Sequence, residues 1–322
     1  MRLLYIIILT ACCNTVFSQV RYFDERYIST LALLNPVIIN PGATGAFDTH
    51  QIIVNYKNKW ASFPDSPKSY HLSYDGPIAE RLGFGVLAAA DTNGALTTTK
   101  IQGSLAYTIQ SVKNKISAGF SAEYINHGLS GDVLTHKYID QGDAIITERE
   151  LGNGFFDVSV GAYGVYNKVF TYGIAFPSLV SSRIDQNSDD QFTREIGFIL
   201  NAGYIYKKPG SDVVFEPSIF VKQLNNVPFH VDVNLLGRFA DDRFRGGISY
   251  TIEGDQKIGF IIGTAFNAMN INYSYNASRH AFQTYNNGTH EFSLRFDISG
   301  DRKLMDIIPD EDTIPVLEGI DK

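Results

Sequence analysis

The chain has 322 residues, of which 44% are hydrophobic and 13% aromatic, with 18 Tyr, 22 Phe and 28 Gly. Aromatic side chains suit the pleated surface of a strand, so this composition favours β-structure, and one large β-domain can account for the whole length. The formal net charge of -7 argues against nucleic acid or anionic lipid as the main partner, because both need a basic face that replaces counterions.

Residues 1–18 have the features of a secretory signal peptide. Arg2 supplies the positive charge, residues 3–9 form the apolar run, and residues 16–18 provide the small-residue cleavage site. The mature chain is therefore expected to begin at Gln19.

A lipoprotein signal is the alternative for the same region. Residues 9–12 resemble the box in which Cys12 would be lipidated, and the sequence leaves this open. Both cysteines, Cys12 and Cys13, fall inside the predicted signal. Normal cleavage would leave a mature chain with no disulfide and no cysteine-ligated metal.

After the signal the dominant pattern is alternation with a period of two. No apolar stretch approaches the ~20 residues that a membrane-spanning helix needs. Apolar side chains occupy every second position in residues 115–125, and the pattern recurs at 195–206, 231–239 and 291–298. The opposite face of each segment carries charged residues, which would be costly in a dry sandwich core but suit the wet lumen of a barrel.

Turn signals from Gly, Asn, Asp and Pro separate the strands. The sequence predicts an all-β fold, a transmembrane outer-membrane β-barrel of about 14 antiparallel strands across residues 49–298. The longest connections, 127–153, 178–191 and 278–286, share one end, which is the outside if the first strand leaves the periplasm. Strands are expected near residues 49–60, 68–76, 82–91, 96–110, 114–126, 154–166, 168–177, 192–207, 211–224, 228–240, 243–253, 257–266, 269–277 and 287–298.

Two segments are expected outside the barrel, in the periplasm. They are residues 19–48 and the acidic tail 299–322, whose residues 313–317 could add a strand to a periplasmic partner, with disorder as the alternative. A secreted partner would be met by the long external loops, because loops on a rigid scaffold vary freely. The acidic residues of these loops are Asp132, Asp140, Asp143, Glu148, Glu150, Asp189 and Asp190.

Several short motifs occur in a fixed order: Asn40-Pro41-Gly42-Ala43-Thr44-Gly45, Tyr56-Lys57-Asn58-Lys59-Trp60, Ser73-Tyr74-Asp75-Gly76-Pro77, Gly83-Phe84-Gly85, Asp91-Thr92-Asn93-Gly94, and Gly288-Thr289-His290-Glu291-Phe292-Ser293-Leu294. Their order and spacing resemble the PorP/SprF family over nearly the whole mature chain. Gly42 stands where that family usually has Ala, and Lys57 where Arg is usual. The motif positions are the candidate site residues, with a structural or docking role: Asn40, Pro41, Gly45, Tyr56, Trp60, Asp75, Pro77, Gly83, Gly85, Asp91, Gly94, His290 and Glu291.

The resemblance implies an outer-membrane component of type IX secretion and, in gliding bacteria, of surface adhesin delivery, acting without catalysis or cofactor. The implied partners are a secreted surface protein with a type IX C-terminal signal, the secretion components including the outer-membrane translocon, and outer-membrane lipid around the barrel. The PorP-like branch serves secretion itself, and the SprF-like branch is typically paired with one large secreted protein. The sequence does not separate the two branches.

Three motif segments have alternative interpretations. Residues 91–94 begin like a calcium loop but lack the later acidic ligands, so a hairpin turn is preferred. Trp60, followed by Phe63 and Pro64, suits an aromatic girdle at the outer rim, with a structural role as the alternative. Residues 40–45 form either a periplasmic docking element or the turn that feeds the first strand.

No motif indicates catalysis or a metal site. There is no GxSxG nucleophile motif, so an enzyme is not expected. A diffusion porin or small-ligand transporter is the main alternative function, and a soluble β-sandwich adhesin the third. The histidines include no i, i+4 helical pair and no HExxH, and are expected in the wall or loops: His50, His71, His127, His136, His230, His280 and His290.

Overall fold

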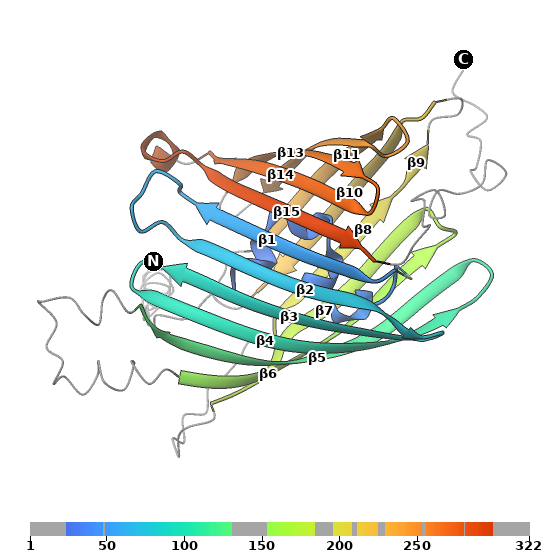
Figure 1. The fold of residues 1–322 in the computed structure, drawn as a ribbon, viewed down its shortest axis with the longest axis horizontal. Helices are drawn as coiled ribbons and strands as arrows, with labels where there is room; N and C mark the ends of the chain where they lie inside the picture. Colours follow the sequence, from blue (N-terminus) through green and yellow to red (C-terminus); the bar gives the residue numbers. More distant parts are fainter. Residues whose placement is uncertain are drawn as a thin grey trace, which may run out of the picture.

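The computed structural model describes residues 24–47, 49–130, 153–183, 196–207, 211–224, 229–252, 256–279 and 281–298. Their strands form a single antiparallel sheet that closes on itself, because β1 pairs with both β2 and β15, and β10 pairs with β11. The two-residue β9 continues β8 along β10, so the wall has fourteen strands. This closed barrel confirms the predicted all-β fold (Figure 1).

Most strands lie within a few residues of their predicted positions, but β7 continues six residues into the connection expected at 178–191, and β8 begins at Phe198, six residues later than expected. Their bounds are β1 (Gln51–Lys59), β2 (Lys68–Ala79), β3 (Leu82–Asn93), β4 (Leu96–Gln110), β5 (Asn114–Leu129), β6 (Asn153–Tyr166), β7 (Phe170–Arg183), β8 (Phe198–Tyr204), β9 (Tyr206–Lys207), β10 (Val214–Gln223), β11 (His230–Phe239), β12 (Phe244–Ile252), β13 (Lys257–Phe266), β14 (Met269–Ser278) and β15 (Thr289–Asp297).

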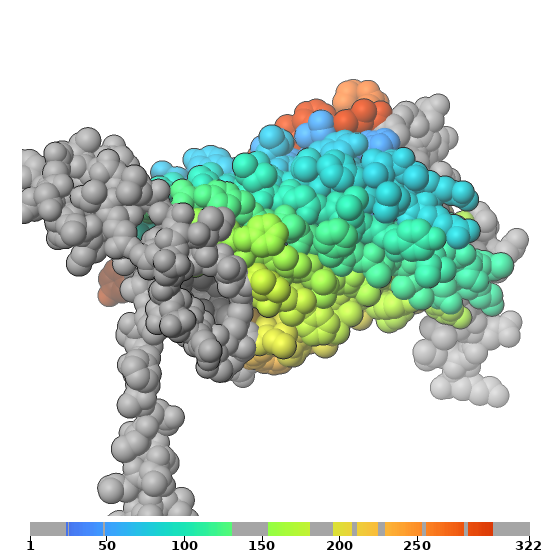
Figure 2. Space-filling model, turned by 90° about the horizontal axis from the view of Figure 1, so that it is seen from below, coloured from blue at the N-terminus to red at the C-terminus, as the bar shows by residue number. Residues whose placement is uncertain are grey.

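The two faces of the wall have opposite chemistry. On β5, Phe120 and Tyr124 are 50% and 46% exposed, whereas Ser121 and Glu123 between them are 3% exposed. The exposed side chains point outward and the buried ones into the lumen, which reverses the arrangement of a soluble protein. An apolar outer belt around a polar interior is the arrangement of a barrel in a membrane. On the face seen in Figure 2 the coloured segments lie side by side in sequence order, from cyan through green to yellow, as consecutive strands of one wall.

The two ends of the barrel differ in their connections. The connections after β1, β5, β7 and β14 are the long ones in sequence, and the strand ends that flank them lie at one end of the barrel, here called the loop-rich end. The segments after β2, β4, β6, β11 and β13 are short and lie at the other end, here called the short-turn end. The chain enters β1 and leaves β15 at the short-turn end.

Residues 24–47 lie inside the barrel and are called the lumen plug below. They form four short 3₁₀ turns, η1 (Glu25–Ile28), η2 (Thr30–Leu33), η3 (Pro36–Ile38) and η4 (Pro41–Ala43). In Figure 1 these turns are the blue ribbon enclosed by the strands. η4 packs against β4, β5, β6 and β7, and η2 against β14 and β15, so the plug touches opposite sides of the wall.

The position of the plug corrects the expectation that residues 19–48 lie outside the barrel in the periplasm, at least for residues 24–47. The inward face of the wall carries many charged and polar side chains, and burying them without partners would be costly. The plug supplies those partners. It begins near the loop-rich end, where Asp24 meets Lys100 near the start of β4, and descends to the short-turn end, where Ala46 meets Lys115 near the start of β5.

None of the helices in the described ranges is long and apolar enough to cross a membrane. The remaining helical turn, η5 (Ala281–Tyr285), lies in the connection between β14 and β15. Several sequence-based expectations fall outside the described residues, namely the signal with Cys12 and Cys13, the acidic loop residues, His136, His280 and the tail 299–322.

Candidate functional site

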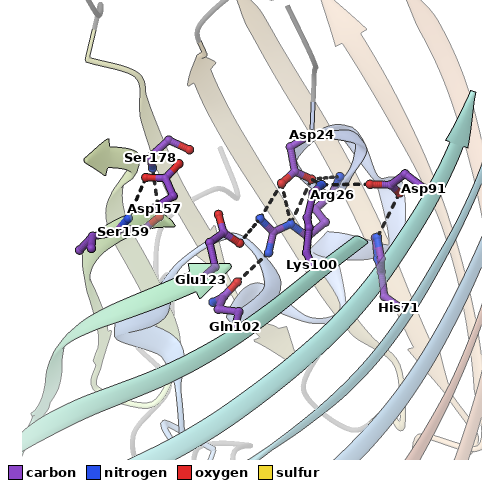
Figure 3. A network of polar contacts seen from close by, with 11 residues as sticks. Asp24, Arg26, His71, Asp91, Lys100, Gln102, Glu123, Asp157, Ser159 and Ser178 are labelled. Carbon is purple, nitrogen blue, oxygen red and sulfur yellow. Dashed lines mark hydrogen bonds and ion pairs between the residues drawn. The ribbon is translucent and has the colours of Figure 1, made fainter. Parts of the chain in front are cut away.

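A buried charge network fixes the start of the plug to the wall (Figure 3). The Arg26 guanidinium lies 2.7 Å from Glu123 on β5 and donates a 2.6 Å hydrogen bond to Gln102 on β4. It also donates to Asp24, 2.8 Å away, which accepts the backbone N–H of Arg26 as well and so caps η1. Arg26 is 0% exposed, so all of its charge is balanced inside the protein.

Lys100 on β4 extends this network to β3. Its ammonium lies 2.9 Å from Asp24 and 3.0 Å from Asp91, and so bridges plug and wall. The His71 ring approaches Asp91 at 3.8 Å, which is too long for a hydrogen bond. The network therefore joins three neighbouring strands to the first residues of the plug.

The ionisation of the plug side chains follows from these neighbours. Burial alone would raise the pKa of Asp24, but the Arg26 and Lys100 cations outweigh it and hold that pKa well below its usual range. Burial would lower the pKa of Arg26, but Asp24 and Glu123 raise it well above its usual value. Burial raises the pKa of Tyr27. Both members of the Asp24–Arg26 pair are thus charged at neutral pH.

Glu291 on β15 holds the second turn of the plug. Its carboxylate accepts the backbone N–H groups of Thr30 and Leu31, both at 3.1 Å, and the Ser29 hydroxyl at 2.6 Å. The first N–H groups of a helical turn have no partner within the turn, so a carboxylate placed there satisfies them and complements their positive end. Asn276 on β14 donates to Glu291 at 3.2 Å and orients it. Glu291 is 2% exposed, so its carboxylate is buried between the wall and the plug.

The last turn of the plug is held by hydrogen bonds between side chains and backbone groups. Asn40 caps η4 by accepting the N–H of Gly42 at 2.9 Å, and its amide donates to the carbonyl of Ala162 on β6 at 3.0 Å. Gly45, with a φ of 66°, donates its N–H to Asp75 on β2 at 3.2 Å. A side chain is disfavoured at this φ, which explains glycine at the end of the motif.

Glycines of the wall make room for this turn. A Cβ at Gly83 on β3 would collide with the Thr44 carbonyl oxygen, and one at Gly161 on β6 would collide with the Asn40 side chain. The wall and η4 therefore approach each other at backbone distance, which only glycine permits.

The motif residues identified from sequence divide into two groups. One group forms the plug or the wall positions that hold it, directly or through Lys100: Asn40, Pro41, Gly45, Asp75, Gly83, Gly85, Asp91 and Glu291. The structure brings these residues together along the lumen, although they come from the plug and three different strands.

The second group lies away from the plug. Tyr56 packs on Tyr70 on the outer face of the wall, with ring centroids 5.1 Å apart. Trp60 follows β1 at the loop-rich end, with the Lys59 ammonium 4.8 Å from its ring. His290 contacts the Tyr273 hydroxyl on the outer face at 2.7 Å. Pro77 lies near the end of β2, and Gly94, with a φ of 57°, forms the β3–β4 hairpin turn, so residues 91–94 are a hairpin as preferred.

Sequence reasoning did not identify several residues that anchor the plug. Lys100 and Glu123 were visible only as polar members of alternating strands, and Arg26 had no signal because residues 24–47 follow no single period. Lys257 on β13 was also missed, although its ammonium donates to the Ile28 carbonyl at 2.9 Å. Within the described part of the chain, no three His, Cys, Asp or Glu side chains are grouped so that they could hold a metal ion.

Comparison with known proteins gives a family match. The family model described as type IX secretion system membrane protein PorP/SprF matches residues 24–296, and so includes the plug as well as the barrel. No curated protein sequence matches the chain significantly.

Similar solved structures include the outer membrane protein Omp33 of Acinetobacter baumannii, with a TM-score of 0.46 and 8% identity over 77% of this chain and 97% of that one. The toluene transporter TbuX of Ralstonia pickettii gives a TM-score of 0.45 and 10% identity over 84% and 94%. The KdgM porin gives 0.41 and 7% identity over 77% and 99%.

Proposed function

This chain belongs to the PorP/SprF family of type IX secretion system membrane proteins, and from that premise we propose that it is a non-catalytic export partner or surface anchor for a secreted protein such as an adhesin. The protein is an outer-membrane β-barrel. Its family is one of secretion components and not a known enzyme family.

The observation that carries the proposal is the lumen plug. A diffusion pore needs a continuous water-filled path, whereas residues 24–47 are held between opposite walls by ion pairs at one end and backbone contacts at the other. Buried ion pairs are costly to break because each leaves an uncompensated charge. A barrel held shut in this way supports the role of a scaffold on which other proteins assemble.

The motif residues take a structural role in this proposal. Asp75, Gly83 and Glu291 keep the plug in place, and the plug in turn keeps the wall rigid. The proposed partners meet the scaffold at its ends, the secreted protein at the loop-rich end and the type IX components, including the translocon, around the barrel. Loops on a rigid scaffold provide variable contact surfaces, which suits recognition of one particular secreted protein.

The experiment that tests the proposal is purification of the tagged protein from outer membranes in mild detergent, with mass spectrometry of what accompanies it. We expect one large secreted protein together with type IX machinery. The matched control is a chain in which residues 132–150 are replaced by a Gly/Ser linker, which is expected to lose the secreted protein while the barrel still assembles. A wild-type barrel recovered alone would overturn the proposal.

A diffusion porin or small-ligand transporter is the second candidate, and one observation favours it. A cavity of about 480 Å³ remains at the short-turn end, lined by charged as well as apolar side chains. Planar-bilayer recordings separate the two functions. A stable open pore in the wild-type protein would support the porin, whereas a silent wild-type barrel that conducts after deletion of residues 24–46 would support the plugged scaffold.

A further inference from the structure

The cavity at the short-turn end has an excess of positive charge that the plugged scaffold does not explain. It lies between η2, η3 and the end of the plug on one side and β10, β11, β12 and β15 on the other, and it reaches the rim at the β4–β5 and β6–β7 turns. Its acidic lining residues are Glu216 and Asp297, and its basic lining residues are Lys113, Lys115, Lys168, Arg238, Arg245 and Arg295.

Arg245 on β12 is the unusual member of this set. It is 7% exposed, yet its only hydrogen bond among the described residues goes to the neutral amide oxygen of Asn270, at 2.8 Å, and its Nε has no partner. Arg238, by contrast, has two carboxylates, Glu216 at 2.6 Å and Asp242 at 2.8 Å. A buried guanidinium that has no carboxylate in direct contact is unfavourable, so Arg245 is the arginine of this cavity best placed to bind an anion.

The strand register strengthens this point. Arg245 stands directly opposite Arg238 in the β11–β12 ladder, and like charges directly opposite each other are destabilising. Glu216 and Asp242 both pair with Arg238. The third arginine, Arg295, pairs with Asp297. Of the three arginines that line the cavity, Arg245 is therefore the one with which a further carboxylate would pair.

Apolar side chains form part of the remaining cavity wall, beside neutral polar ones such as Gln51 and Asn114. Leu33, Leu34, Pro36 and Phe47 of the plug contribute to it, and so does Val165 of β6. A ligand that combines carboxylates with aliphatic and polar groups matches this mixed lining, and an acidic peptide has that chemistry whereas a small inorganic anion does not.

The sequence that follows β15 has this chemistry. β15 ends at Asp297, which itself lines the cavity, so the chain leaves the described structure at the cavity's edge. Residues 304–321 contain no Lys or Arg and include aliphatic residues such as Ile307, Ile314 and Val316. Nine residues beyond Asp297 reach up to roughly 30 Å, which is ample to return into the lumen. The acidic residues of this segment are Asp306, Asp310, Glu311, Asp312, Glu318 and Asp321.

We propose that the acidic segment 304–321 of this same chain folds back into the cavity at the short-turn end, where one of its carboxylates pairs with Arg245. This inference concerns the chain itself and holds whether or not a secreted partner is bound.

Peptide binding to the purified barrel tests the proposal. The probe is a fluorescein-labelled synthetic peptide of residues 303–322, added in detergent to a barrel that ends at Gly300. We expect saturable binding whose affinity falls with added salt. Arg245→Gln should lower the affinity for the peptide roughly tenfold or more, because a charge-assisted hydrogen bond is lost. The matched control is Arg243→Gln, two residues away and exposed, which is expected to leave binding unchanged.

The full-length barrel distinguishes this chain's own segment from a partner's acidic peptide. Its tethered segment competes, so it should bind the added peptide at least about tenfold more weakly than the shortened barrel. Equal binding to both barrels would mean that the cavity serves a peptide from elsewhere and would overturn the proposal, as would an Arg245→Gln barrel with unchanged affinity.

A second measurement does not depend on how Arg245→Gln assembles. No cysteine follows residue 13, so Asp310→Cys and Ser111→Cys introduce the only thiols of a barrel expressed from Gln19 onward. Ser111 lies on the rim of the cavity. A short bismaleimide is expected to link this pair within one chain, and not the pair Asp310→Cys with Asn93→Cys at the loop-rich end. Absence of the first crosslink would count against the proposal.

Discussion

The Arg26 guanidinium lies 2.7 Å from the Glu123 carboxylate, and these two buried side chains join the plug to the wall across 97 positions of sequence. Replacing Arg26 by Gln would leave Glu123 buried without a cation, and we expect the free energy of unfolding to fall by about 3–5 kcal/mol. Urea titration of the barrel refolded in lipid would measure this change.

The double variant provides the internal check. Arg26→Gln combined with Glu123→Gln removes both charges and should recover part of the loss, because neither partner is then left charged alone. Arg243→Gln, an exposed arginine of the β11–β12 turn, serves as the control and should leave unfolding unchanged. A loss in the double variant equal to the sum of the two single losses would show that the pair is not coupled.

A second prediction concerns the contact between Glu291 and the second turn of the plug. Replacement by Ala removes the acceptor of two backbone N–H groups and the Ser29 hydroxyl, each bond contributing about 1.5–3 kcal/mol when the acceptor is charged. We expect the plug to loosen and planar-bilayer recordings to show open events that are absent in the wild-type protein. Glu291→Gln keeps one acceptor oxygen and should show an intermediate effect.

The control for this experiment lies on the same strand. Ser293→Ala changes the next inward-facing residue of β15 and should remain as silent as the wild type. If Glu291→Ala were equally silent and its plug equally resistant to protease, the carboxylate would not be what holds η2.

A third prediction concerns the steric fit between Gly83 and the plug. A Cβ here collides with the Thr44 carbonyl, so Gly83→Ala must displace the plug or the strand, at a cost of about 1–3 kcal/mol. Gly103→Ala on β4 is the matched control, because a Cβ there meets nothing within 4 Å. Heat-dependent mobility in electrophoresis should report a lower unfolding temperature for the first variant alone, and equal temperatures would contradict the proposed close packing.

The barrel could be predicted from the sequence because its signal is local and repeated. Alternation such as that of residues 115–125 is visible within one strand, and the turn residues between strands set the register of each hairpin. The structure adds little to this beyond exact bounds, for example a β2 that continues to Ala79.

The plug could not be predicted in the same way. Its 3₁₀ turns repeat no period, and its contacts join distant positions, such as Ser29 with Glu291 across 262 residues. Asp75 and Glu291 were singled out because they stand in motifs, but the motif alone did not say what they bind. Arg26 and Lys100 stand in none of the motifs. Only the three-dimensional arrangement shows that both cations pair with Asp24, and that each also pairs with a carboxylate of the wall.

The last prediction concerns pH and follows from Asp24. Arg26 and Lys100 hold its pKa well below the usual value near 3.9 despite burial, so the folded state favours the charged carboxylate. A group whose pKa is lowered on folding stabilises the protein above its unfolded pKa, and this contribution disappears as the pH falls through the folded pKa. The anchorage of η1 by Asp24 should therefore be constant from neutral pH down to about pH 5 and weaken only below about pH 4. Protease protection of the plug, followed across this range in lipid, should show the same trend, and Asp24→Asn should remove the acid-dependent part. Release of the plug with a midpoint near pH 6 in the wild-type protein would show that a different group controls its retention.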